Sequence, residues 1–167
     1  DVDENWNIPQ SVSFTSLFSV EHLKKSIMQP LFNNERSDIE TAFVKYLENS
    51  SKVAWWFKNG DRDSVYFAVP YEEDARKKPF YVDFIVYLKD GSIGLFDTKA
   101  GLTKQVAGPK IDGLGAYIKD QNKKGKKLFG GIVTNSDQRK YSARWLYFTN
   151  EGKELTNSFD NWENLTL

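Results

Sequence analysis

The sequence lacks cysteine and contains one histidine, His22. Without cysteine the chain can form neither a disulfide nor a thiolate metal site, and a lone histidine argues against a histidine-based metal centre. No apolar stretch approaches the ~20 residues of a membrane span, and neither a signal peptide nor a P-loop occurs. We therefore expect a cytoplasmic protein that does not itself use ATP.

What is present is typical of a soluble globular protein. The 167 residues are 40% hydrophobic and 15% aromatic, which is enough for one domain with a real core. The formal net charge is zero, which argues against a protein that coats DNA without specificity. The chain opens at Asp1 rather than at methionine, so we expect it to be part of a larger protein.

The spacing of apolar residues predicts an α/β protein with a mixed sheet and helices on both faces. Helices are expected at residues 17–31, 37–49 and 108–122. Strands are expected at residues 52–59, 65–69, 128–134 and 144–148, with a polar loop at 71–79 and a closing helix or strap after residue 150. Within the first of these strands, Trp55 and Trp56 are expected to point to opposite faces.

The most informative stretch is residues 80–99, where two apolar, β-prone runs flank Asp90-Gly91. That dipeptide is a strong hairpin signal. The chain could reverse over those two residues alone, or over Lys89–Gly91 with Gly91 left-handed in a β-bulge. We favour the longer reversal, because it pairs apolar residues with each other on both faces of the hairpin.

The choice of reversal decides where the charged residues lie. The shorter turn pairs Asp83 with Thr98 and leaves Asp83 and Asp97 on opposite faces. The longer turn pairs Asp83 with Asp97 and places both on the same face as Lys99, because strand side chains repeat every two residues. The sequence therefore predicts two carboxylates and an ammonium group in one place.

Two carboxylates directly across a hairpin repel each other and contribute nothing to the fold. One interpretation is that Asp83 and Asp97 lie at a solvated strand end. The other is that they hold a hard divalent cation such as Mg²⁺, which prefers oxygen ligands. The apolar neighbours and the Asp-x-Lys spacing up to Lys99 favour the second interpretation.

Asp83 followed by Asp97-Thr98-Lys99 resembles the signature of the PD-(D/E)xK nuclease superfamily, and the surrounding sequence is most similar to the C-terminal endonuclease domain of type III restriction subunits and helicase-nucleases. The similarity covers roughly residues 35–135.

The resemblance implies a restriction-endonuclease-like fold. Residues 35–150 would form the nuclease-like core, 1–34 an N-terminal lead-in and helix, and 151–167 a C-terminal strap. It implies a Mg²⁺-dependent DNA endonuclease, with Mn²⁺ as a substitute, that works beside the helicase/ATPase or methyltransferase modules of a parent protein.

The resemblance also implies individual roles. Asp83, Asp97, the backbone carbonyl of Thr98 and Glu40 would hold the metal. Lys99 would position the attacking water or stabilise negative charge that develops on the phosphate.

Glu40 has two interpretations. Ser37-x-x-Glu40 is a capping-box pattern, in which the glutamate satisfies a helix end. In the nuclease family, a helix of this form supplies an acidic residue near the metal, and with the resemblance we favour that role. Glu35 is the alternative acid.

Lys110, Lys104 and Gln105 are the candidate DNA contacts, because a basic or polar residue on the following helix contacts the phosphate in similar nucleases. Two other functions stay open. The domain could be a catalytically silent DNA-binding or docking module, or it could be a repair nuclease or junction resolvase.

Overall fold

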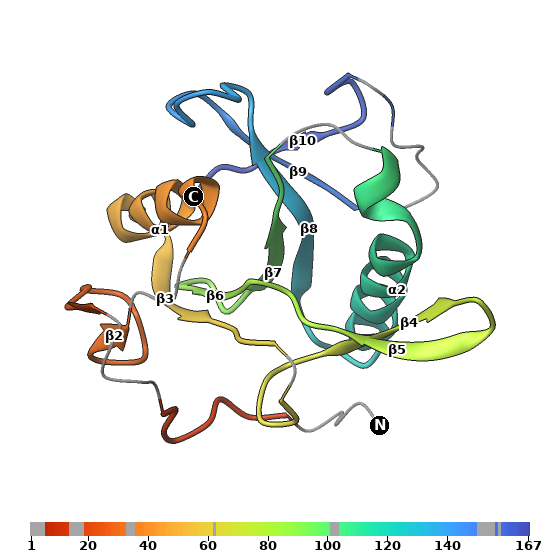
Figure 1. Ribbon diagram of the computed structural model, residues 1–167, viewed down its shortest axis with the longest axis horizontal. Helices are drawn as coiled ribbons and strands as arrows, with labels where there is room; N and C mark the ends of the chain where they lie inside the picture. Colours follow the sequence, from red (N-terminus) through yellow and green to blue (C-terminus); the bar gives the residue numbers. More distant parts are fainter. Residues whose placement is uncertain are drawn as a thin grey trace.

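The computed structural model describes residues 6–13, 19–32, 36–61, 63–100, 104–149, 156 and 158–167. Its centre is a six-stranded sheet in the order β10-β9-β8-β7-β6-β3 (Figure 1). The strands are β3 (Val53–Lys58), β6 (Phe84–Leu88), β7 (Ile93–Thr98), β8 (Leu128–Asn135), β9 (Trp145–Phe148) and β10 (Glu163–Asn164). β7 and β8 are parallel, and every other neighbouring pair is antiparallel. The prediction of a mixed α/β sheet is confirmed.

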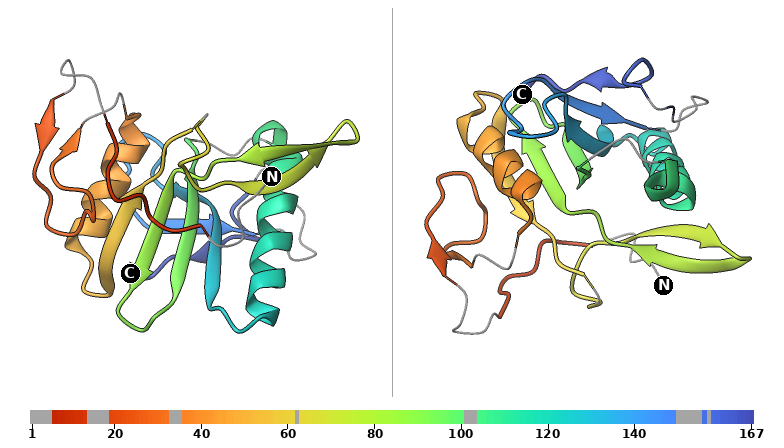
Figure 2. Two further views of the ribbon diagram at one scale, coloured as in Figure 1. Left: turned by 90° about the horizontal axis from the view of Figure 1, so that it is seen from below. Right: turned by 45° about the horizontal axis from the view of Figure 1, so that its top comes forward.

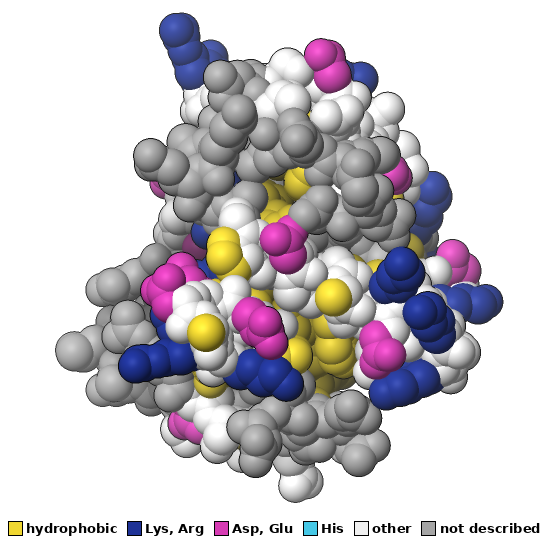
Figure 3. Space-filling view, turned by 90° about the vertical axis from the view of Figure 1, so that its right-hand side faces the viewer, with side chains coloured by type: hydrophobic (Ala, Val, Ile, Leu, Met, Phe, Trp, Pro, Cys, Tyr) yellow, Lys and Arg dark blue, Asp and Glu magenta, His cyan; other side chains and the backbone are white. Residues whose placement is uncertain are grey.

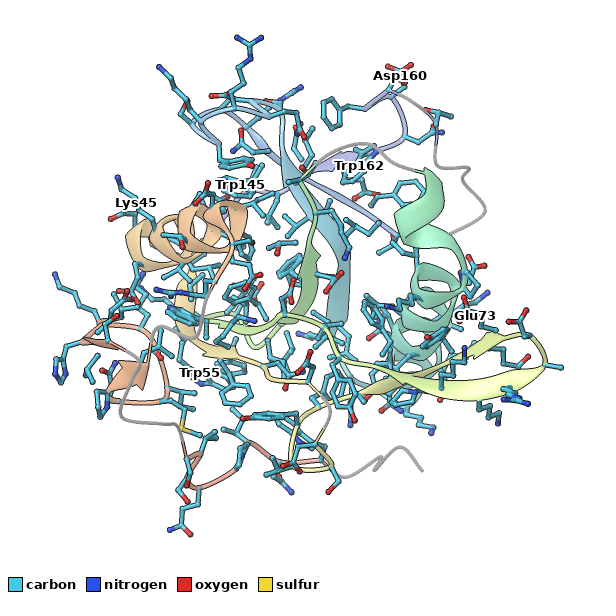
Figure 4. The ribbon with its side chains drawn as sticks, viewed as in Figure 1. Lys45, Trp55, Glu73, Trp145, Asp160 and Trp162 are labelled. Carbon is cyan, nitrogen blue, oxygen red and sulfur yellow. The ribbon has the colours of Figure 1, made fainter. Side chains whose placement is uncertain are left out.

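Two helices cover opposite faces of this sheet, as Figure 1 shows: α1 (Asp38–Asn49) and α2 (Lys104–Lys123). A separate hydrophobic core lies between the sheet and each helix. Successive side chains of a strand point to opposite faces, so Phe84 packs in the core under α1 and Ile85 in the core under α2. Figure 4 shows Trp145 beside α1, where its ring centroid is 5.2 Å from that of Phe43.

The central hairpin reverses over three residues, as predicted. The amide of Gly91 donates to the carbonyl of Leu88, the amide of Leu88 donates to the carbonyl of Ser92, and Gly91 has a φ of 89°. In this register Phe84 pairs with Phe96. The longer reversal is therefore confirmed, and continued by one position this register sets Asp83, just before β6, opposite Asp97 in β7.

Several other elements agree with the sequence. The predicted helix at 37–49 is α1, with Ser37 as its N-cap, and the predicted strands at 52–59, 128–134 and 144–148 correspond to β3, β8 and β9. Trp56 is fully buried on the α1 side, whereas Trp55 stacks on Tyr87 at the opposite face with ring centroids 5.2 Å apart.

The predicted helix at 17–31 is wrong over the described residues 19–31. This segment contains the short strands β1 (Val20–Glu21) and β2 (Leu31–Phe32), which pair with each other. Between them the chain runs beside the edge strand β3: the amide of Ile27 donates to the carbonyl of Trp56, and the amide of Trp56 donates to the carbonyl of Lys25. The unpaired backbone of an edge strand outweighed the helical spacing of the apolar residues.

The predicted strand at 65–69 and loop at 71–79 are also wrong. A two-stranded hairpin takes their place, made of β4 (Val69–Glu73) and β5 (Arg76–Phe80). It packs across α2 near Gly113 and projects beyond the sheet (Figures 1 and 2). It turns at Asp74 and Ala75, whose φ angles of 51° and 59° are left-handed. Pro70 does not end a strand here, because it lies in a two-stranded ribbon where proline is tolerated.

The helix predicted at 108–122 begins earlier, at Lys104, and has a break at Gly108, whose φ of 11° and ψ of −129° are not helical. Pro109 follows that break.

On this side of the molecule acidic and basic side chains are interspersed, with hydrophobic ones visible between them (Figure 3).

The C-terminal segment partly follows the prediction of a strap. Residues 150–155 and 157 lie outside the described residues, and β10 adds an edge strand to β9. After β10, the backbone N–H of Leu165 donates a hydrogen bond to the carbonyl of Trp145. Within the described part of the chain, neither helix combines the length and apolar character needed to cross a membrane.

The parallel contact between β7 and β8 requires glycine. Gly130 has a φ of 130°, and a Cβ atom there would lie 2.1 Å from the carbonyl oxygen of Leu95. We expect Gly130→Ala to lower the free energy of unfolding by about 3 kcal/mol or more, because backbone in a central strand must move. Urea denaturation measures this.

The matched control is Gly125→Ala. Gly125 also has a positive φ, 93°, but no atom lies within 4 Å of the added Cβ. Gly125→Ala should lower the free energy of unfolding by only about 1–2 kcal/mol, which is the cost of placing alanine in a left-handed conformation. Equal losses in the two variants would contradict the close approach of β7 and β8.

Candidate active site at the end of the central hairpin

Asp83 is held at the end of the hairpin by its neighbour across the strands. Its Oδ2 accepts a hydrogen bond from the backbone N–H of Thr98 and another from the Thr98 hydroxyl, both 2.8 Å long. The register of the hairpin makes this possible, because Thr98 is the last residue of β7 and Asp83 immediately precedes β6. The expected role of Thr98, a carbonyl ligand to a metal, stays a prediction, whereas its two donors orient Asp83.

Asn59 fixes the backbone that carries Asp83. The backbone N–H of Asn59 donates to the backbone carbonyl of Asp83 at 2.9 Å. The buried side chain donates to the carbonyls of Phe67 and Val82 and accepts from the amide of Phe67. All of these bonds are buried, so the residue before β6 has little freedom to move. Sequence reasoning assigned no role to Asn59.

Asp97 is the buried member of the carboxylate pair, with 6% of its surface exposed. Burial raises its pKa to about 7, and repulsion from Asp83 adds to that rise. Lys99 opposes the rise, since its Nζ lies 3.1 Å from Oδ2 of Asp97. The structure therefore brings together Asp83, Asp97 and Lys99, and it holds a buried carboxylate close to a partly exposed one.

A second ammonium group, that of Lys58, lies on the other side of Asp83. Lys58 Nζ is 3.8 Å from Oδ1 of Asp83 and 3.3 Å from Oε2 of Glu40. It also lies over the ring of Phe84, 5.2 Å from the centroid. Sequence reasoning did not select Lys58. The available signal was strand alternation, because Lys58 shares a face of β3 with the buried Trp56.

Glu40 takes part in the cap of α1, and its role as an acid near a metal stays a prediction. Its backbone N–H donates to the N-cap hydroxyl of Ser37, and that hydroxyl donates to Oε1 of Glu40 at 3.1 Å. The other carboxylate oxygen, Oε2, reaches Lys58. Glu40 is thus part of the helix cap and also the outer end of a chain of charges that runs through Lys58 to Asp83. Glu35 lies outside the described residues.

The oxygen ligands of this site fit a metal ion only in part. Over the described residues, no three Asp, Glu or His side chains converge as a ready-made metal cluster. The adjacent pair of Asp83 and Asp97 nevertheless suits a hard divalent cation, because it offers oxygen ligands and a repulsion that the ion would cancel. Glu40 could join only if its contact with Lys58 were exchanged.

The candidate DNA contacts are placed differently. Lys110 lies on α2, with its Nζ over the rings of Tyr71 and Phe80 at 5.9 and 5.5 Å from their centroids. Its ammonium therefore faces the β4–β5 hairpin. Lys104 and Gln105 are in the first turn of α2, and their side chains lie outside what the structure describes.

Comparison with known proteins places the chain in a family. The model of the YagJ family matches residues 20–160, a range that includes both helices and nearly all of the sheet. The chain belongs to the YagJ family. Searches of curated proteins and of solved structures gave no match.

The raised pKa of Asp97 makes a prediction about stability in a metal-free buffer. In the folded state this carboxyl keeps its proton up to pH about 7, whereas in the unfolded chain it loses it near pH 4. The folded state therefore binds more protons between those values, and its stability falls as the pH rises from 4 to 7. Asp97→Asn, which cannot ionise, should have a higher Tm than the native chain at pH 8, and this advantage should shrink at pH 5.

The expected gain at pH 8 is a few degrees, since about 1 kcal/mol shifts the Tm of a protein of this size by 2–4 °C. Asp120→Asn is the control, because Asp120 forms an exposed ion pair with Lys124 and such pairs contribute little. A gain for Asp97→Asn that is the same at both pH values would contradict a raised pKa.

Proposed function

We propose that this chain is a metal-dependent DNA endonuclease domain of the PD-(D/E)xK type, which hydrolyses phosphodiester bonds. The observation that carries the proposal is the joint placement of Asp83, Asp97 and Lys99 at one end of the central hairpin. A carboxylate pair with one buried member, next to a lysine, is costly for folding, and it is useful for binding a cation and a phosphate.

The arrangement of the elements supports the same proposal at the level of fold. Helix α1 precedes three antiparallel strands, β3, β6 and β7, and helix α2 then leads into β8, which is parallel to β7. A helix lies on each face, as the restriction-endonuclease-like fold implies. Fold alone would not establish a function, so the argument depends on the site.

Asp83 and Asp97 are the residues that would hold Mg²⁺. When bound there, Mg²⁺ would polarise a phosphoryl oxygen and lower the pKa of a coordinated water. Thr98 keeps the Asp83 carboxylate in place through its two hydrogen bonds. Lys99 stands within an ion-pair distance of Asp97, from where its ammonium can orient a water or neutralise charge on the phosphate.

A second candidate function has one observation in its favour. Lys58 contacts both Asp83 and Glu40, and Lys99 contacts Asp97, so each carboxylate already has a cationic partner in the protein. That arrangement suits a catalytically silent DNA-binding or docking module of the same fold. A repair nuclease or junction resolvase would use the same residues as the proposed enzyme and differ in its DNA substrate. Helicase/ATPase or methyltransferase modules of a parent protein stay the proposed partners.

Cleavage of supercoiled plasmid DNA with Mg²⁺ or Mn²⁺ tests the nuclease proposal. Asp97→Ala and Lys99→Ala should each lower the rate by at least about 100-fold, because the first removes a ligand of the metal ion and the second removes the positive charge beside the phosphate. Lys89→Ala, in the turn at the opposite end of the hairpin, should cleave at the native rate. Native-like cleavage by either site variant would remove that residue from the mechanism.

Calorimetry with Mn²⁺ separates the nuclease from the silent module. The native chain should bind Mn²⁺, and Asp83→Asn should bind it at least about tenfold more weakly, since one charged ligand is lost. Lys58→Met, which removes the competing ammonium but keeps the length of the side chain, should bind Mn²⁺ more tightly. No heat of binding in any of the three proteins, with folding verified by circular dichroism, would favour the silent module.

A further inference from the structure

A cavity of about 230 Å³ lies next to the acidic site. Lys58 belongs to both, since it lines the cavity and contacts Asp83. The wall is formed by the segments at 10–12 and 28–31, by Arg36 just before α1, and by residues 57–60 at the end of β3 together with Tyr66. The volume is below the ~300–1,000 Å³ of sites for drug-sized ligands, so it suits a small group.

Arg36 is the unusual residue of this cavity. Its side chain is only 3% exposed. One nitrogen, Nη2, donates to Oε2 of Glu21 at 2.6 Å. The other two, Nε and Nη1, are buried and have no hydrogen-bond partner among the described residues. A guanidinium has five N–H donors, so three of them are left without an acceptor.

Such an arrangement is costly in an apo protein. A buried donor without a partner has lost its hydrogen bonds to water without replacing them, and the loss is larger when the group is charged. Because a guanidinium only donates, the missing partner must be an acceptor, and an anionic oxygen is the strongest one.

The charge of the cavity wall points the same way. Its two ionisable cations are Arg36 and Lys58, and no Asp or Glu occurs among the described lining residues. Glu21, with 33% of its side chain exposed, forms an ion pair with Nη2 of Arg36 and is not one of the residues that line the cavity. Arg36 and Lys58 come from different elements and both line this small space. The Lys58 ammonium already contacts Glu40 and Asp83, whereas Nε and Nη1 of Arg36 have no partner in the described part of the chain, so the guanidinium is the group that favours the entry of a negatively charged group.

We propose that this cavity is a phosphate-binding site, in which Arg36 and Lys58 hold a phosphate group of a nucleic-acid strand next to the acidic site. The identification of the strand as DNA rests on the proposed function, whereas the phosphate site itself does not. Arg36 donates through Nε and Nη1 to the phosphate oxygens, and Lys58 supplies a second positive charge. The strand is thereby held beside the carboxylate pair.

Binding is measured in EDTA, so that it requires no metal and no catalysis. The first probe is inorganic phosphate. Its binding is detected as a Tm that is higher in phosphate than in sodium chloride of equal ionic strength. The second is a fluorescent single-stranded deoxyoligonucleotide of ten bases, followed by anisotropy. The native chain should respond to both probes.

Arg36→Lys retains the positive charge and a donor for Glu21 but loses the Nε and Nη1 donors. We expect its affinity for phosphate and for the oligonucleotide to fall at least about tenfold. Arg139→Lys is the matched control, since Arg139 is exposed on a loop, and it should bind as the native chain does. Equal affinities of Arg36→Lys and the native chain would overturn the proposal.

Glu21→Gln gives a test of opposite sign. It removes the carboxylate that competes for the guanidinium, so the rise in Tm produced by phosphate should be larger than in the native chain. This variant keeps the proposal falsifiable if Arg36→Lys does not fold. An unchanged or smaller phosphate response in Glu21→Gln would count against an anion bound at Arg36 and would overturn the proposal.

The remaining outcomes separate the two proposals. Phosphate binding that depends on Arg36, combined with oligonucleotide binding that does not, would overturn the assignment to a nucleic-acid strand. Asp97→Ala should lose cleavage but retain phosphate binding. If it retains both, the nuclease proposal fails and the phosphate site stands.

Discussion

The repulsion between the Asp83 and Asp97 carboxylates is the constraint on which the site depends. The packing of the sheet gains nothing from this repulsion. Burial of Asp97, together with the charge of Asp83, raises the pKa of the Asp97 carboxyl to about 7. The surrounding structure holds the pair in place: Thr98 binds one carboxylate, Lys99 binds the other, and Asn59 fixes the backbone before β6. Stability is given up here so that two acids remain close together, which is a common property of functional sites.

Sequence reasoning succeeded where local chemistry decides the structure. Asp90-Gly91 fixed the central hairpin, because glycine adopts the left-handed conformation that the bulge needs. Ser37 likewise fixed the start of α1 through its cap. From these two elements the register, the two faces of the sheet and the proximity of Asp83 to Asp97 all followed.

It failed where partners distant in sequence decide. The segment at 19–31 has helical spacing, but the exposed edge of β3 binds it as extended chain. Lys58 and Asn59 were given no role because their partners at Glu40 and Val82 lie 18 and 23 residues away, and no short pattern connects them. Arg36 shows the same limit, since a missing hydrogen-bond partner can be recognised only once a side chain is known to be buried.

The three-residue reversal at Lys89–Gly91 has an evolutionary consequence. Deleting one residue there would leave every apolar and acidic side chain of the hairpin in the sequence. It would nevertheless shift one strand past the other by a single position and turn alternate side chains from one core to the other. The length of this loop should therefore vary less within the family than the identity of its residues, apart from the glycine.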